Sequence, residues 1–98
     1  MENFHQLLAG FHFKQKYFLK ERDFFESLEK QQNPKTLVIS CCDSRVDPAL
    51  LLNCKPGELF VIRNVAALVP DVSQVKAPSS VMAAIEYGVK HLNIEHIV

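Results

Sequence analysis

The chain has 98 residues, enough for one domain whose core buries a little over half of the unfolded chain's surface. Its 11 Lys and Arg balance 11 Asp and Glu, and the charges are scattered, which excludes the basic stripe of a nucleic-acid-binding protein and favours a small or neutral ligand. No stretch reaches the roughly 18 consecutive apolar residues of a membrane span, and the start lacks a secretory signal, so we expect a cytoplasmic protein that binds no nucleic acid and no membrane.

Residues 1–30 are predicted to form a helical arm of one or two amphipathic helices, with Gly10 as the candidate break. Apolar residues recur there at helical spacing, and most of the chain's seven Phe lie in this arm. So short a segment cannot hide that much aromatic surface alone, so we expect it to pack on another subunit. Residues 31–98 are expected to form an α/β domain.

Two buried strands are predicted next. The first, "TLVIS", follows "QQNPK", and the second, "LFVIR", follows the turn "KPGE". Between them, "DPALLLN" predicts a short helix with Asp47 as N-cap and Pro48 as its first residue.

After a loop, "SSVMAAIEYGVKHLN" predicts a helix capped by Ser79 or Ser80, and "IEHIV" begins a third strand. One stripe of that helix is apolar: Val81, Ile85, Val89 and Leu92. Strands alternating with helices indicate an α/β fold with a mainly parallel sheet. Ligands bind at the carboxyl ends of such strands, where "SCCDSR" and "RNVA" fall.

The "SCCDSR" turn concentrates the chemistry of the chain. Three cysteines are an odd number, and reducing compartments disfavour disulfides, so buried, catalytic or metal-bound thiols are expected. A thiolate suits zinc, and a carboxylate two residues later can join the metal or accept a hydrogen bond from its water. Arg45 would keep Asp43 ionised and oriented.

Other interpretations of this turn stay open. A phosphatase-like loop needs an Arg six residues after its Cys, whereas Arg45 follows Cys41 by four and Cys42 by three. A redox dithiol favours C-x-x-C spacing. In a purely structural interpretation, both thiols are small buried hydrophobes, Asp43 caps a turn and Arg45 makes a surface ion pair.

The order of three blocks indicates a family. C-x-D-S-R after a buried strand, then "PGELFVIRNVA" and "AAIEYGVKHLNIEHIV", resembles the β-class carbonic anhydrases from about residue 30 to the last residue. The resemblance implies a Zn2+ enzyme that hydrates carbon dioxide to bicarbonate, and a homodimer or higher homo-oligomer. It also implies that the C-terminal part of the family's sheet is missing from this sequence.

Particular residues take roles from the same resemblance. Cys41 falls on a zinc ligand, and Asp43 and Arg45 on the family's Asp–Arg pair; Asp43 accepts a hydrogen bond from zinc-bound water in an open site and binds zinc itself in a closed one. Gln32, Phe60 and Val65 fall on positions that line the substrate pocket in the plant-like branch.

The bicarbonate-regulated branch uses a Trp three residues before the ligand Cys, where this chain has Val38, although the Arg of that branch is present as Arg63. The resemblance therefore favours the unregulated, open type.

Departures from the family pattern limit what we expect. The family's H-x-x-C motif, which gives two further zinc ligands, does not occur in this sequence, and His91 and His96 are interpreted as structural or solvated. Ala67 stands where the family commonly has Asn. We expect weak zinc binding and impaired hydration by these 98 residues, with a zinc-free, non-catalytic dimerising protein as the alternative.

Overall fold

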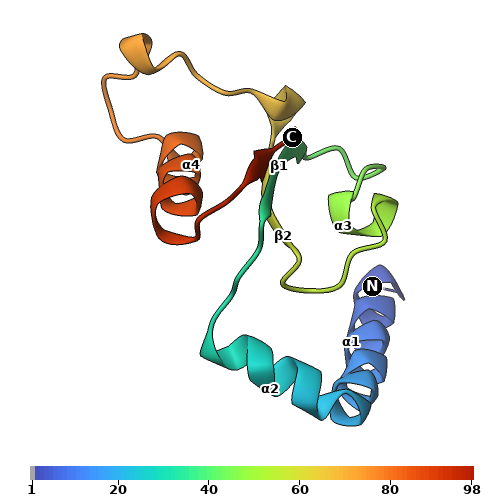
Figure 1. Cartoon of the computed structure of the whole chain (residues 1–98). Helices are drawn as coiled ribbons and strands as arrows, with labels where there is room; N and C mark the ends of the chain where they lie inside the picture. The colour runs from blue at the N-terminus through green and yellow to red at the C-terminus, as the bar shows by residue number, and fades with distance from the viewer. Residues whose placement is uncertain (1) are drawn as a thin grey trace. The chain divides into compact units, whose positions relative to one another are not determined.

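The computed structural model describes residues 2–98, and the chain divides into two compact units after Gln31. The first unit contains two helices, α1 (Glu2–Lys20) and α2 (Arg22–Lys30). The second contains β1 (Thr36–Cys41), α3 (Pro48–Leu51), β2 (Leu59–Asn64), α4 (Ser80–His91) and β3 (His96–Ile97), together with the short 3-10 turns η1 (Val65–Ala67) and η2 (Val72–Gln74) (Figure 1).

The helical arm bends at Glu21 and not at Gly10, which corrects the sequence-based expectation. An isolated glycine inside a helix costs about 1 kcal/mol relative to alanine, which a long helix tolerates. The bend lets aromatic rings meet: the Phe25 ring stands edge-on to Phe18, with 4.5 Å between centroids, and 6.0 Å from Tyr17. Aromatic packing between the two helices thus accompanies the change of direction.

The second unit is built on a parallel sheet with strand order β2-β1-β3, which confirms the predicted fold class. The connection from β1 to β2 carries α3 and that from β2 to β3 carries α4, and the two helices lie on opposite sides of the sheet (Figure 1). The chain passes from β1 to β2 on one side, and the connection from β2 then crosses β1 to reach β3 on its other side, so the strand order switches at the carboxyl end of β1. Open α/β sheets bind ligands at such a point.

Local capping signals place both helices of this unit. The Asp47 carboxylate accepts hydrogen bonds from the Ala49 and Leu50 amides, so Asp47 is the N-cap of α3 as predicted. The Ser79 hydroxyl accepts from the Met82 amide at 3.3 Å, so of the two candidate serines it is Ser79 that caps α4.

Few residues of the described chain are fully buried. Among residues 3–98, the buried members of the hydrophobic core are Leu37 and Val38 on β1 and Leu92 after α4, and the other buried residues are Pro34, Pro48 and Gly88. The prediction that "LFVIR" is a buried strand is wrong in this respect: β2 is only half-buried, and Val61 is 38% exposed. The reason is its place in the sheet, because among residues 2–98 β2 is an edge strand that pairs with β1 on one side only.

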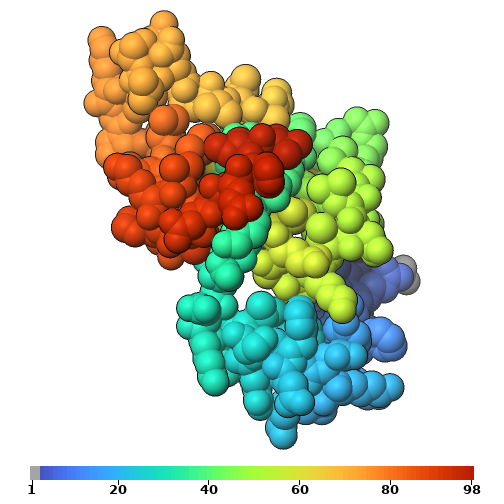
Figure 2. Space-filling model, in the orientation of Figure 1, coloured from blue at the N-terminus to red at the C-terminus, as the bar shows by residue number. Residues whose placement is uncertain are grey.

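The segment of residues 70–78 protrudes from the rest of the second unit before α4 begins (Figure 2). Asp71 closes its η2 turn by accepting from the Ser73 amide at 2.9 Å and the Ser73 hydroxyl at 2.8 Å, and the amide bond is the larger of these two causes that lower the pKa of Asp71. Within residues 2–98, no helix has both the length and the apolar character needed to cross a membrane.

Candidate active site

Two turns meet at the carboxyl end of the sheet. One follows β1 and carries Cys41, Asp43 and Arg45, and the other is η1, which follows β2. In the parallel register Cys41 stands beside Asn64, and the Cys42 amide donates to the Asn64 carbonyl at 2.7 Å. This bond extends the strand pairing by one residue and joins the two turns.

Asp43 and Arg45 form a two-pronged ion pair. The Arg45 Nη2 lies 2.7 Å from Asp43 Oδ2 and its Nε lies 3.0 Å from Oδ1, while the Arg45 backbone amide donates to Oδ1 at 2.8 Å. The hydrogen bonds from the Arg45 side chain, followed by the amide, lower the pKa of Asp43, and the same contact raises the pKa of Arg45. The carboxylate is thus ionised and oriented at neutral pH, as a hydrogen-bond acceptor requires.

The Cys41 thiol is half-exposed and lies against backbone donors. The backbone N–H groups of Asp43 and then Ala66 interact with the sulfur and lower the pKa of Cys41. A lowered pKa favours the thiolate, which is the form that binds a metal. Cys42 is exposed beside it, and burial is the main cause that raises the pKa of Cys54.

The η1 turn holds strained backbone next to the thiol. Ala66 and Ala67 have φ of 63° and 55°, in the left-handed region that residues with a Cβ rarely adopt. The Asn64 side chain bridges the turn, because its amide nitrogen donates to the Leu68 carbonyl at 2.8 Å and its oxygen accepts from the Leu68 amide at 2.9 Å. The residue pattern predicts a strand end at "RNVA" but indicates no role for this side chain.

Three further predicted site residues, Val65, Phe60 and Gln32, lie outside the cysteine turn. Val65, 72% exposed, lines a groove of about 460 Å3 with Asn64, Leu68 and Val81 among its neighbours. Phe60 lies four residues before Asn64 and faces α4: its ring is 6.1 Å from the Tyr87 ring, and an added Cβ on Gly88 would meet it at 3.4 Å. Gln32 is exposed in the segment between α2 and β1.

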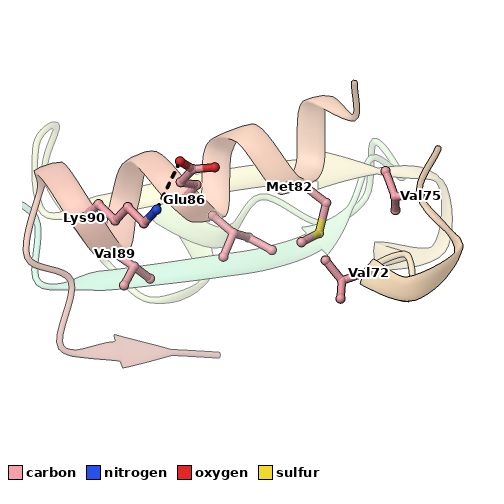
Figure 3. Close-up of a pocket in the computed structure, with 7 residues that line it drawn as sticks. Val72, Val75, Met82, Glu86, Val89 and Lys90 are labelled. Atoms are coloured by element: carbon pink, nitrogen blue, oxygen red, sulfur yellow. Dashed lines mark hydrogen bonds and ion pairs between the residues drawn. The ribbon is translucent and has the colours of Figure 1, made fainter. Parts of the chain in front are cut away.

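Another groove, of about 470 Å3, lies apart from the cysteine turn. It runs between α4 and the η2 turn, where the Met82 side chain points toward Val72 and the Glu86–Lys90 ion pair flanks the helix (Figure 3). Val89, which lies on the predicted apolar stripe of α4, lines this groove and is 49% exposed. Chemically active side chains gather at Cys41 and not here, so we place the candidate active site at the cysteine turn.

A zinc ion suits part of this centre. Cys41 offers a thiolate backed by N–H groups, and Asp43 an ionised carboxylate two residues away, which are donors that zinc takes. Within residues 2–98, however, no group of three or more His, Cys, Asp or Glu side chains is placed to hold a metal. The described residues therefore provide part of a zinc site and not a complete one.

Comparison with known proteins identifies the family. The family model described as carbonic anhydrase matches residues 36–98, and the chain belongs to that family. A carbonic anhydrase of Synechococcus elongatus is 45% identical over 94 residues, and β-carbonic anhydrase 3 of Arabidopsis thaliana is 44% identical over 94. These matches cover 95% of this chain but only 34% and 36% of the two relatives.

Solved structures agree and place the chain in the β class. The β-carbonic anhydrase CcaA superposes with a TM-score of 0.90 at 39% identity, over 99% of this chain and 43% of that one. A tetrameric β-carbonic anhydrase of Sordaria macrospora gives a TM-score of 0.82 at 34% identity, over 99% and 47%. The chain thus spans less than half the length of these proteins.

Proposed function

We propose that this chain takes part in the reversible hydration of carbon dioxide to bicarbonate. The observation that carries the proposal is the centre formed by the Cys41 thiol and the Asp43–Arg45 ion pair at the carboxyl end of β1, within a chain of the carbonic anhydrase family. Cys41 would hold zinc, and groups other than Cys41 and Asp43 would supply the remaining ligands. Zinc bound in this way supplies a hydroxide at neutral pH for attack on carbon dioxide.

The protein groups have separate tasks in this proposal. Arg45 keeps Asp43 ionised and holds its orientation, so that the carboxylate can accept a hydrogen bond from a water or hydroxide oxygen. We propose the open arrangement, in which Asp43 is paired with Arg45 and does not bind the metal. Val65, with Phe60 and Gln32, would supply the wall of a substrate pocket for a small, uncharged gas. With two donors available, we expect the 98 residues alone to bind zinc weakly and to hydrate carbon dioxide slowly.

The two adjacent cysteines allow a matched test. Zinc affinity by competition with a chromophoric chelator, and carbon dioxide hydration by stopped flow, are measured on the 98-residue chain and on Cys41→Ser and Cys42→Ser. We expect Cys41→Ser to weaken zinc binding by about tenfold or more and to abolish hydration, and Cys42→Ser to change neither. Equal zinc affinity in all three proteins, or no zinc binding by the wild type, would contradict the proposed role of Cys41.

The cellular setting belongs to the same proposal. The chemistry needs a free Cys41 thiol and a diffusible substrate, both available in the cytoplasm. We therefore propose a cytoplasmic enzyme with carbon dioxide and bicarbonate as its small-molecule partners.

We also propose that the chain forms a homo-oligomer through α1. Phe4, Leu7 and Phe11 lie on one face of that helix at i, i+3 and i+7, and each is more than half exposed. Such an apolar face is stabilised by packing on another protein surface. The similar β-carbonic anhydrases of Sordaria macrospora are tetrameric, which favours a second copy of the chain as the partner.

The second candidate function follows from this face alone: a zinc-free protein that associates through α1 and has no catalytic activity. Sedimentation of Phe11→Ser compared with Phe13→Ser tests the interface, because Phe13 is 71% exposed on the other side of the helix. We expect only Phe11→Ser to shift the protein toward monomer. An oligomer without zinc binding or hydration would favour the second candidate.

A further inference from the structure

One side chain from β2 holds the whole cysteine turn. The Arg63 guanidinium donates to three backbone carbonyls: Nε to Cys41 at 3.1 Å, and Nη2 to Asp43 at 2.8 Å and to Val46. These acceptors begin, centre and end the turn that carries Cys41, Asp43 and Arg45. Because the guanidinium is planar and its donors have fixed directions, it sets the orientation of all three carbonyls together.

The turn has few other attachments of comparable reach. The Val46 amide donates to the Asp43 carbonyl at 3.0 Å, which closes the turn upon itself. The Arg45 side chain is 86% exposed, so apolar burial does not hold that residue in place. The Asp43–Arg45 pair spans two residues and needs both to keep their backbone positions. Arg63 bonds the backbone on either side of Arg45, at the carbonyls of Asp43 and Val46.

We infer that Arg63 is a positioning residue: it fixes the Cys41–Val46 turn and thereby holds the Asp43 carboxylate against Arg45. Its importance for hydration rests on the proposed function, whereas the geometric role stands on the three carbonyl bonds. The Arg63 guanidinium donates hydrogen bonds to the backbone carbonyls of Cys41, Asp43 and Val46, so the protein's own backbone occupies these donors.

The test is local amide hydrogen exchange and the side-chain NMR signal of Arg45 in the 98-residue chain. In Arg63→Met we expect the Arg45 and Val46 amides to exchange about tenfold faster or more, the factor expected for loss of a charge-assisted hydrogen bond. The Arg45 Nε–H resonance should shift and broaden as its carboxylate partner moves. The Ile39 amide of β1, which donates to the Val98 carbonyl at 2.8 Å just after β3, should keep its exchange rate.

Two further variants separate positioning from general stability. Arg63→Lys keeps the charge but replaces the planar fork with a single ammonium nitrogen, so its exchange rates should fall between those of the wild type and Arg63→Met. Arg22→Met removes an exposed arginine paired with Glu26 at 3.6 Å and should leave the turn unchanged.

Unchanged exchange at Arg45 and Val46 in Arg63→Met would overturn the inference, and so would an equal acceleration at Ile39, which would indicate general destabilisation. If Arg63→Met does not fold, the same criteria apply to Arg63→Lys. Hydration of carbon dioxide is assayed separately on the wild type. If the wild type is inactive but the turn still loosens in Arg63→Met, the proposed function is contradicted and the role of Arg63 is not.

Discussion

Asn64 stands beside Cys41 in the parallel register, and three of its groups hold the site: its carbonyl accepts from Cys42, and its side-chain amide bridges both backbone groups of Leu68. The first bond joins the turns, and the other two keep η1 closed, so that the Ala66 amide stays beside the thiol.

Removing the Asn64 side chain tests this arrangement. Asn64→Ala loses both bonds to Leu68, and we expect the free energy of unfolding to fall by about 1–2 kcal/mol, roughly 1 kcal/mol for each bond. Asn64→Asp keeps an acceptor for the Leu68 amide and should lose less. Urea unfolding measures the three proteins, with the exposed Asn33→Ala as the control. A loss in Asn33→Ala as large as in Asn64→Ala would contradict the bridging role.

The Asp43–Arg45 pair predicts a pH dependence of stability. The pKa of Asp43 is lowered in the folded protein, mainly by the Arg45 hydrogen bonds, so the pair stabilises the fold above the unfolded carboxyl pKa of about 4. That contribution is lost as the pH falls through the lower folded pKa. We expect the difference in unfolding free energy between wild type and Arg45→Gln to be full at about pH 6 and to shrink toward about pH 2. A difference that stays constant over this range would rule out the ionised pair as its source.

The sequence predicted features whose cause is local. Asp47 and Ser79 cap helices because a side-chain oxygen meets an amide two or three residues ahead, which short-range chemistry decides. The Asp43–Arg45 pair is also local, with two residues of separation. Such features depend little on how the strands are ordered.

Features set by tertiary structure were missed. The bonds from Arg63 span 17 to 22 residues, and they exist only because the parallel register brings the ends of β1 and β2 together. Val61 was predicted buried because its strand is apolar, but hydropathy does not say which strand stands at the edge. Likewise, a single glycine such as Gly10 destabilises a helix only slightly, so α1 continues through it when no tertiary contact favours a bend there.

The surroundings of two half-exposed thiols predict different reactivity. Backbone N–H groups lower the pKa of Cys41, whereas burial, and then the Glu58 carboxylate, raise the pKa of Cys54. Because the thiolate is the nucleophile, Cys41 should reach its half-maximal alkylation rate at a lower pH than Cys54.

Iodoacetamide labelling from about pH 6 to 10, followed by peptide mass spectrometry, measures both thiols in one protein. The experiment uses excess chelator and a Cys42→Ser background, so that each labelled peptide carries one thiol. Faster labelling of Cys54 at the lower pH values would show that the N–H groups do not activate Cys41.

The left-handed backbone of η1 predicts that Ala→Gly stabilises the fold at Ala67, whereas the same substitution at Ala83 in α4 destabilises it. Ala67 has φ of 55°, where a Cβ costs about 1–2 kcal/mol, so Ala67→Gly should raise the free energy of unfolding by about 0.5–1 kcal/mol after the greater entropy of the unfolded glycine is subtracted. Ala67→Asn should also stabilise, since Asn tolerates this region. Ala83→Gly, at an exposed position inside α4, should instead lose about 1 kcal/mol. Urea unfolding measures both variants. If Ala67→Gly is destabilised as much as Ala83→Gly, the backbone at Ala67 is not strained. The η1 turn would then place the Ala66 amide beside Cys41 without a conformational cost.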